Sequence, residues 1–540
     1  MNDLLSILLV ASLAAPLALL GACFVKRWRQ RALALQWLAP IPSLAAGLIG
    51  MTGAPLSRDL PVLGFTLYLD PPGALLLAVA AALWIVVSAA LWRARRPDGR
   101  FGVSWLLTMT GNIGVFIAGD LVSFYLVYAL VSIPAYGLFA FSNDSEQKRA
   151  GAVYLAFAIL GEAVLLLAFV MLQAGEPHAS ARIVDVMGAL PASPWRDAAL
   201  GLIIAGFGMK IGMVPFNGWM PLNYKAAPIP VAALLSGAGV KAGVIGLIRF
   251  LPHGVTLEGW GVALAAIGFL SAYYGVVFGL TQRNPKVILA YSSISQMGVI
   301  TAALGTALLA GHADASFNVA FYSANHLLVK AALFLTIGAF ATRGTRLSPV
   351  WFALAVALAL SLAGLPLTGG ALAKLAMKPQ FDGGTVGLLA TLSSIGTALL
   401  MTHFLGCLAE PPSGAAEECP SGLVRSWPAV ALAALLVPWA FYEGVGGDAS
   451  KALHFGEILD GLWPVVIGVV LALALRRMAW SPPDVPVGDS IVFAERAYLR
   501  LLNVGPVFEG LDARLRQWPA AGLSLLLIIL SLLTAGVSGR

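Results

Sequence analysis

The sequence predicts an all-α polytopic membrane protein. Of its 540 residues, 59% are hydrophobic and only 11% are charged, and the mean hydropathy is +0.87, a balance that ordinary soluble domains do not have. Apolar runs long enough to cross a hydrocarbon core of about 30 Å recur from end to end. Lysines stand inside several of these runs, where they are costly unless they face a partner or a water-filled path.

We count about sixteen candidate spans along the chain. They cover residues 3–24, 33–53, 71–92, 101–118, 120–141, 151–174, 197–223, 228–250, 258–281, 287–310, 317–341, 348–378, 386–408, 423–443, 459–476 and 519–537. The first run has no basic region before it and no small-residue cleavage site after it, so we expect a retained span.

Two of these runs, 197–223 and 348–378, are too long for one simple span and contain proline or glycine near a lysine. They stand five spans apart, and such a pair of interrupted helices indicates two repeats of inverted topology. We therefore expect these divisions: N-terminal helices 1–100, first repeat 101–250, second repeat 258–408, C-terminal helices 423–476, an amphipathic interfacial helix 480–518 and a terminal helix 519–540.

The basic residues predict the orientation, because positive loop residues are retained on the cytoplasmic side. They follow odd-numbered spans, which places the N-terminus outside. The net charge of +7 is therefore explained by membrane topology and does not indicate a nucleic-acid partner. The Ala- and Leu-rich composition suggests a bacterial inner membrane. The basic residues are Lys26, Arg27, Arg29, Arg31, Arg93, Arg95, Arg96, Arg100, Lys148, Arg149, Arg283, Lys286, Arg343, Arg346, Arg476 and Arg477.

Ionisable residues inside the spans form a row and not a single site. A lysine that is desolvated beside a carboxylate can gain and lose a proton at working pH, and rows of such groups make proton relays. The alternative for each lysine is a helix-end position from which it snorkels to the interface, which fits Lys378 best. The row comprises Glu162, Lys210, Lys241, His326, Lys330, Lys374, Lys378 and His403.

Breaks in the two long spans lie close to their lysines. Prolines remove amide donors and interrupt helices, and broken helices with buried charges mark transport sites. We expect Lys210 just before a discontinuity and Lys374 near one. The interrupting residues are Pro215, Pro221, Gly364 and Pro366.

Two further positions in the row have specific expectations. His326 and Lys330 are one turn apart, and Tyr322 is one turn earlier, so the three share a helix face. Histidine titrates near neutrality, which suits a switching position; the alternative is a histidine satisfied by a carbonyl or by Asn325. Glu162 interrupts an apolar span and needs a partner, for which Lys210 is the natural candidate; the alternative is a glutamate held by helix packing.

No cofactor or metal site is expected in this chain. Cys23, Cys407 and Cys419 are far apart and fit no metal or iron–sulfur spacing. No phosphate loop, dinucleotide fingerprint or nucleophile triad is present, so we identify no catalytic residue. Any electron chemistry would belong to partner subunits.

Several segments resemble one family of membrane subunits. PFNGWMP and APIPVAALL between Lys210 and Arg249 look like the signature of the antiporter-like subunits of respiratory complex I, Mrp-type sodium/proton antiporters, membrane-bound hydrogenases and formate hydrogenlyase. TQRNPKVILAYSSISQMG at 281–298, ANHLLVKAALFL at 324–335 and GLPLTGGALAK at 364–374 are similar to further family motifs. The resemblance covers about residues 60–410, with order and spacing maintained.

The resemblance implies about 14 core helices in two inverted five-helix repeats, with charged residues joining two half-channels at mid-membrane. Lys210 corresponds to the key lysine of the seventh helix and Lys241 to the ionisable residue of the eighth. His326 and Lys330 match the eleventh-helix pair, and Lys374 matches the terminal lysine or glutamate of the twelfth. The stretch 480–518 resembles a shortened lateral helix.

Two positions depart from the family pattern. The family usually has a glutamate on the fifth helix, where this chain has Ala129 after Tyr128, so we hypothesise that Glu162 supplies the carboxylate instead. Tyr322 stands where many relatives have histidine. Both departures suggest a side branch of the family and not mainstream complex I.

The leading interpretation is a proton-translocating subunit of a larger complex that includes redox partners of the quinone, ferredoxin, formate or hydrogenase type. Two alternatives remain within this interpretation: the transported ion is sodium, or the larger complex is an Mrp-type antiporter. A second class pairs such a subunit with a soluble zinc protein and uses the ion gradient for inorganic-carbon uptake. A third is a free-standing transporter of an organic anion, which the length of the row disfavours.

Overall fold

The computed structural model describes residues 2–60, 64–94, 99–139, 144–343, 349–410, 419–444, 447–478 and 483–497. The chain divides into two units, Met1–Val487 and Gly488–Arg540, and the candidate site lies in the first. In the second unit, residues 489–497 are helical. The rest of the predicted interfacial helix 480–518 beyond residue 497, and the predicted terminal helix 519–540, lie outside the described residues.

The first part of the chain forms helices that flank a short hairpin. The hairpin pairs β1 with β2 in antiparallel register, with Leu56 opposite Leu69 and Asp59 opposite Thr66. The elements are α1 (Asn2–Cys23), α2 (Lys26–Leu35), η1 (Gln36–Leu38), α3 (Ile41–Gly50), β1 (Leu56–Asp59), β2 (Thr66–Leu69), α4 (Pro71–Ala94) and α5 (Gly99–Val115).

The middle of the chain follows with one broken span and one irregular span. Its elements are α6 (Leu121–Ser132), α7 (Tyr136–Phe139), α8 (Ser145–Ala174), α9 (Ile183–Ala189), η2 (Leu190–Ala192), α10 (Arg196–Ile211), α11 (Trp219–Ala226), α12 (Ile229–Leu234), η3 (Leu235–Gly239) and α13 (Lys241–Phe250). The segment η3 is a π-turn, so one span is composed of α12, η3 and α13.

The remaining helices contain the second broken span. They are α14 (Glu258–Leu280), α15 (Pro285–Ala310), α16 (Ala315–Arg343), α17 (Pro349–Ala363), α18 (Gly369–Met377), η5 (Lys378–Phe381), α19 (Gly384–Ala409), α20 (Ser421–Gly444), α21 (Ala449–Ala452) and α22 (Phe455–Arg477).

The predicted fold class is confirmed. Among the described residues, 12 helices or helix runs are long and apolar enough to cross a membrane, and each predicted span up to 459–476 coincides with a helix or helix pair. The two long spans are split between α10 and α11 and between α17 and α18, as predicted. The division into repeats remains a prediction.

One predicted boundary is wrong. The second span was expected to begin at residue 33 after a basic loop, but α2 begins at Lys26 and includes the basic residues up to Arg31. These residues are exposed, and straight-chain lysine, arginine and glutamine are good helix formers. The basic cluster is therefore the first turns of a helix and not a loop.

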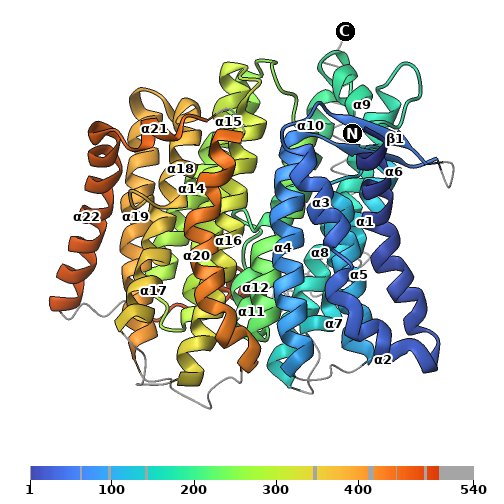
Figure 1. Ribbon diagram of the computed structural model, residues 1–540. Coiled ribbons are helices and arrows are strands. Elements are labelled where there is room, and N and C mark those ends of the chain that lie inside the picture. The colour runs from blue at the N-terminus through green and yellow to red at the C-terminus, as the bar shows by residue number, and fades with distance from the viewer. Residues whose placement is uncertain are drawn as a thin grey trace, which may run out of the picture. The chain divides into compact units, whose positions relative to one another are not determined.

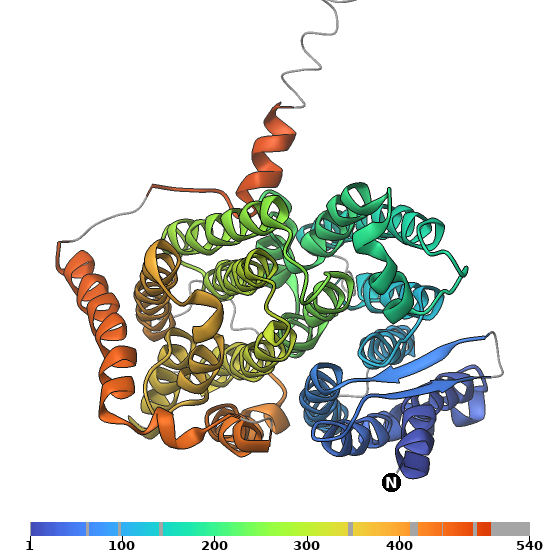
Figure 2. The same ribbon diagram turned by 90° about the horizontal axis from the view of Figure 1, so that it is seen from above.

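The helices are layered from core to periphery. The most apolar window of the span 229–250 is completely buried, and those of α15 and α16 are 94% and 83% buried, whereas those of α1 and α22 are 22% buried. Seen along the helices, α1 lies at one edge of the first unit and α22 at another (Figure 2). Lys241, His326 and Lys330 therefore belong to the innermost helices.

The hairpin of β1 and β2 marks one end of the bundle, which we call the hairpin face. It is tied to the turn after α5 because the Tyr68 amide donates to the Ile117 carbonyl at 2.8 Å and the Thr66 amide donates to the Asp120 carboxylate at 2.7 Å. In Figure 1, α21 lies at this same end and α2 at the opposite end.

Candidate functional site

Lys210 lies in the last turn of α10, immediately before the break in this span. The helix ends at Ile211 and is capped by Gly212. The φ of Gly212 is 72°, in the left-handed region that glycine adopts without a Cβ penalty. Pro215 lies between α10 and α11, whereas Pro221 lies in the first turn of α11, where proline is tolerated. The break expected after Lys210 is therefore present, and Pro215 is the proline inside it.

The Lys210 ammonium is held by hydroxyl groups and aromatic rings. Its Nζ donates to Ser132 Oγ at 2.8 Å and to Tyr154 Oη at 3.2 Å. It lies 5.6 Å and 5.5 Å from the ring centroids of Tyr128 and Tyr154, and each such contact stabilises a cation by about 0.5–2 kcal/mol. Tyr128 directly precedes Ala129, so aromatic contacts occur where the family pattern has an ion pair.

Glu162 belongs to this cluster without touching Lys210 directly. It is buried on α8, and its carboxyl group lies beside the Ser132 hydroxyl that Lys210 also contacts. Its Oε1 has no hydrogen-bond partner. Close packing brings α8 to α10, because a Cβ on Gly161 would lie 3.5 Å from the Gly206 carbonyl oxygen. Ser132 therefore lies near both the carboxylate and the lysine, and it accepts a hydrogen bond from the lysine.

Lys241 is completely buried and contacts the next ionisable residue directly. Its Nζ lies 2.9 Å from His326 Nδ1 and 3.8 Å from the Met297 sulfur. Gly243, half a turn later, faces α10: a Cβ there would lie 3.1 Å from the Cβ of Lys210. Lys210 and Lys241 therefore stand on helices in close contact.

The π-turn before Lys241 is held by a polar residue from α5. Asn112 Nδ2 donates to the Ala238 carbonyl at 2.9 Å, and Trp84 Nε1 donates to Asn112 Oδ1 at 2.9 Å. All of these groups are buried. Such π-turns within helices occur frequently at functional sites, and this one was not predicted from the sequence.

His326 and Lys330 occupy the centre of the row on α16. His326 is bonded to Lys241, and its Nε2 has no partner, so the expected alternative of a histidine held by Asn325 does not describe it. The Lys330 ammonium donates to the Leu289 carbonyl at 2.6 Å. Both side chains are buried, which argues against snorkelling for Lys330.

Tyr322, one turn before His326, joins three helices. Its hydroxyl donates to the Gln296 side-chain oxygen, and Gln296 Nε2 donates to Thr397 Oγ1 at 3.1 Å. Tyr322, Gln296 and Thr397 come from α16, α15 and α19 and are buried. The polar contacts of the α16 face therefore continue toward α19.

Lys374 lies on α18 and reaches back across the second break. Its Nζ donates to the carbonyl of Ala363, the last residue of α17, at 2.5 Å and to Ser394 Oγ. A cation is favourable at a helix C-terminus because of the exposed carbonyls. Gly364, with φ of 90°, and Pro366 lie in the break as expected. Lys374 therefore bridges both halves of the broken span.

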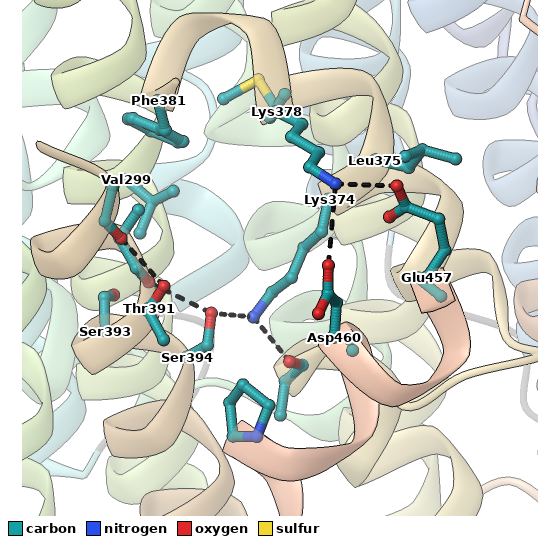
Figure 3. A pocket seen from close by; sticks show the side chains of 18 of the residues that line it. Val299, Lys374, Leu375, Lys378, Phe381, Thr391, Ser393, Ser394, Glu457 and Asp460 are labelled. Atoms are coloured by element: carbon teal, nitrogen blue, oxygen red, sulfur yellow. Dashed lines mark hydrogen bonds and ion pairs between the residues drawn. The ribbon is translucent and has the colours of Figure 1, made fainter. Parts of the chain in front are cut away.

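A cavity of about 450 Å³ adjoins Lys374. Figure 3 shows Lys374 and Lys378 pointing into it, with Glu457 and Asp460 of α22 opposite Ser393 and Ser394 of α19. Lys378 is exposed and lies 2.7 Å from Glu457 Oε1 and 3.9 Å from Asp460 Oδ2, so its position near a span end agrees with the snorkelling interpretation.

His403 lies away from these residues. It is half-buried, with its Nε2 2.8 Å from the Gln282 carbonyl oxygen, which agrees with a packing residue.

Sequence reasoning missed several residues of this site. Ser132, Tyr154 and Gln296 bond to or link members of the row, but uncharged polar residues in a helix give no signal comparable to a charge. It also assigned no role to Arg249, which donates to Asp70 Oδ1 at 3.0 Å and to the Phe116 and Ala118 carbonyls at 2.6 and 2.8 Å. The partly buried pair of Arg249 and Asp70 lies at the C-terminal end of α5.

The arrangement is chemically suited to holding and passing protons. Lys241 and His326 are in direct contact, whereas Lys210 bonds to the hydroxyls of Ser132 and Tyr154. Lys330 and Lys374 each donate to a backbone carbonyl. Water can bridge such polar groups across more than one hydrogen-bond length.

Comparison with known families identifies the chain. Residues 118–399, more than half of it, match the family described as NADH:quinone oxidoreductase/Mrp antiporter, TM. The chain belongs to this family. The matched residues contain the whole row from Glu162 to Lys374 but end before α20.

A relative within the family is subunit N of an NADH-quinone oxidoreductase from Salinispora tropica. The two are 29% identical over 343 residues, which are 58% of this chain and 65% of the relative. The match thus spans slightly less than two thirds of the relative's length.

Two solved structures share the antiporter-family fold. The Mrp complex from Dietzia sp. aligns with a TM-score of 0.72 and 20% identity, covering 99% of this chain and 63% of the matched chain. A chain of the archaeal membrane-bound sulfane sulfur reductase aligns with a TM-score of 0.68 and 21% identity, covering 97% of this chain and 99% of the matched chain.

Proposed function

We propose that this chain is a proton-translocating, antiporter-like subunit of a larger energy-coupling complex in a bacterial inner membrane. The observation that carries this proposal is the contact of 2.9 Å between Lys241 and His326 in the completely buried core. Burying the charged forms of two titratable groups at that depth is costly. Because two positive charges in contact repel each other, the pair favours sharing one proton over carrying a charge on both groups.

The proton pathway runs through Glu162, Lys210, Lys241, His326, Lys330 and Lys374. Lys210 and Lys374 stand at the two broken spans, which is where transporters of this kind of architecture place ion sites. Lys241, His326 and Lys330 lie between them on α13 and α16. The hairpin face is the outer face, because the basic loop residues gather at the opposite end of the bundle.

Glu162 replaces the carboxylate that the family usually has on the fifth helix. This assignment is supported by the position of Glu162 beside the Ser132 hydroxyl that Lys210 contacts. Ala129, at the usual position, has no ionisable group. Movement of this carboxylate toward or away from Lys210 would change how strongly the lysine holds its proton. Transport at the wild-type rate in Glu162→Gln would refute this assignment.

The partner subunits decide how the pathway is driven. We propose redox partners, supported by the similarity of this chain to subunit N of an NADH-quinone oxidoreductase and to a chain of the sulfane sulfur reductase. Affinity extraction of the native complex in mild detergent, followed by mass spectrometry, tests this. Redox subunits support the proposal. A single soluble zinc protein, or only small antiporter subunits, would make the ion gradient the energy source and the redox coupling wrong.

The pathway itself is tested by proton uptake in proteoliposomes that contain the purified native complex. Lys241→Met removes the charge but keeps the length of the side chain, and we expect at least a tenfold loss of transport. Lys225→Met is the matched control, because it removes a lysine from an exposed pair with Glu146. Equal transport by both variants would refute the proposed function. Sodium uptake in place of proton uptake would show that the transported ion is sodium.

A further inference from the structure

Two carboxylates of α22 stand where the row meets the hairpin face. Glu457 and Asp460 lie in the first turns of α22, one turn apart in sequence, and both line the cavity that contains Lys374. This helix lies beyond residues 118–399 that match the family. An acidic pair at the beginning of a helix is favourable for the helix dipole, but that does not account for its position at this cavity.

The cavity is large enough to be wet. At about 30 Å³ per water, its volume of about 450 Å³ holds on the order of ten to fifteen waters. Hydroxyls from α19 and the two lysines of the broken span supply polar partners along its wall. Protons can therefore move from the deep end of the cavity to its mouth through hydrogen-bonded water.

Burial differs sharply between the two ends of the cavity. At the deep end, Lys374 is bonded to Ala363 and Ser394 and is half-buried because it borders the cavity. At the mouth, the side chains of Glu457 and Asp460 are 32% and 69% exposed. A proton leaving Lys374 would therefore meet carboxylates that already contact the aqueous phase.

The charges at the mouth favour cations. The titratable groups that line the cavity are Tyr322, Lys374, Lys378, Asp382, Glu457 and Asp460. Near the mouth these amount to three carboxylates and the single Lys378 ammonium, which is itself engaged by Glu457. A concave site with an excess of negative charge raises the local concentration of cations, including protons.

We propose that Asp460 and Glu457 of α22 form the outer proton acceptor of the pathway. The Lys374 ammonium releases its proton to cavity water and becomes neutral, a carboxylate at the mouth accepts it, and the carboxylic acid then releases it at the hairpin face. This inference rests on the proposed function and extends the pathway to a helix outside the matched family region.

Access to the cavity is tested independently of transport. Thr391→Cys places a thiol on the cavity wall, whereas Ser323→Cys places one at a completely buried position that does not line it. In right-side-out vesicles, a small membrane-impermeant thiol reagent should modify Thr391→Cys and leave Ser323→Cys at the level of the unsubstituted protein. Absence of modification at Thr391→Cys would overturn the inference.

The carboxylates are tested by transport in the reconstituted native complex. We expect the double variant Glu457→Gln with Asp460→Asn to lose at least tenfold in proton transport, and Asp460→Glu with native Glu457 to retain it. Glu258→Gln, an exposed carboxylate in the first turn of α14, is the matched control and should transport normally. Wild-type transport in the double variant would overturn the inference.

Two comparisons separate the possible causes of failure. If the carboxylates merely positioned Lys378, then Lys378→Met would lose as much transport as the double variant, and that result would overturn the inference. We expect Lys378→Met to retain most of the transport that the double variant loses. If the double variant transports normally while Lys241→Met is defective, α22 is not in the pathway and the proposed function stands. If Lys241→Met also transports normally, the proposed function itself fails.

Discussion

Asn112 gives a test of whether the π-turn positions Lys241. In Asn112→Leu, the Trp84 indole N–H loses its acceptor and the Ala238 carbonyl loses a donor, while side-chain volume is nearly retained. An unsatisfied buried polar group costs about 1–3 kcal/mol, so the loss of two partners should cost about 2–6 kcal/mol of stability. Without its anchor, the π-turn can return to an α-helix, which rotates Lys241 relative to its neighbours.

The matched control is Ser88→Ala. The Trp105 indole N–H donates to Ser88 Oγ at 2.9 Å, so this variant leaves the N–H without an acceptor. Ser88 and Trp105 lie on the same two helices, α4 and α5, as Trp84 and Asn112, but they do not contact the π-turn. Both variants should lower the midpoint of thermal unfolding in detergent, but only Asn112→Leu should lower proton transport by tenfold or more. Equal transport losses in the two variants, or normal transport in Asn112→Leu, would refute the reasoning.

Three further substitutions have definite expected outcomes. Arg249→Met leaves the partly buried Asp70 carboxylate without its ion-pair partner and should lower the free energy of unfolding by about 3–5 kcal/mol. This should be seen as a loss of folded protein in detergent size-exclusion profiles. Gly370→Ala should destabilise by about 1–3 kcal/mol, measured by thermal unfolding, because its Cβ would overlap the Ser361 carbonyl oxygen. Gln296→Leu should reduce proton transport in proteoliposomes by about tenfold while the complex remains assembled.

Much of the architecture was predictable because lipid imposes long apolar helices. Hydropathy predicted the spans, and prolines with a nearby lysine predicted both breaks, since an interrupted helix at membrane depth is tolerated only where a cavity or protein surrounds it. The periodicity of α16 correctly placed Tyr322, His326 and Lys330 on buried positions of one helix.

The missed features depend on contacts between helices distant in sequence. Ser132 and Tyr154 meet Lys210 from two other helices, and neither hydroxyl is unusual within its own span. The π-turn has no sequence marker of its own, because its hydrogen bond to Asn112 joins residues 126 positions apart. Glu457 and Asp460 resembled ordinary polar residues at the beginning of a span.

In the proposed pathway, the Lys374 ammonium group has two roles, because it holds the two halves of the broken span together and also carries the proton. Its bond to Ala363 ties α18 to the end of α17, and that attraction depends on the positive charge. On the proposed pathway, release of this proton removes the electrostatic attraction between Lys374 and the end of α17. The backbone of the broken span is thereby sensitive to proton occupancy, and a neutral substitution at Lys374 would alter local geometry as well as conduction.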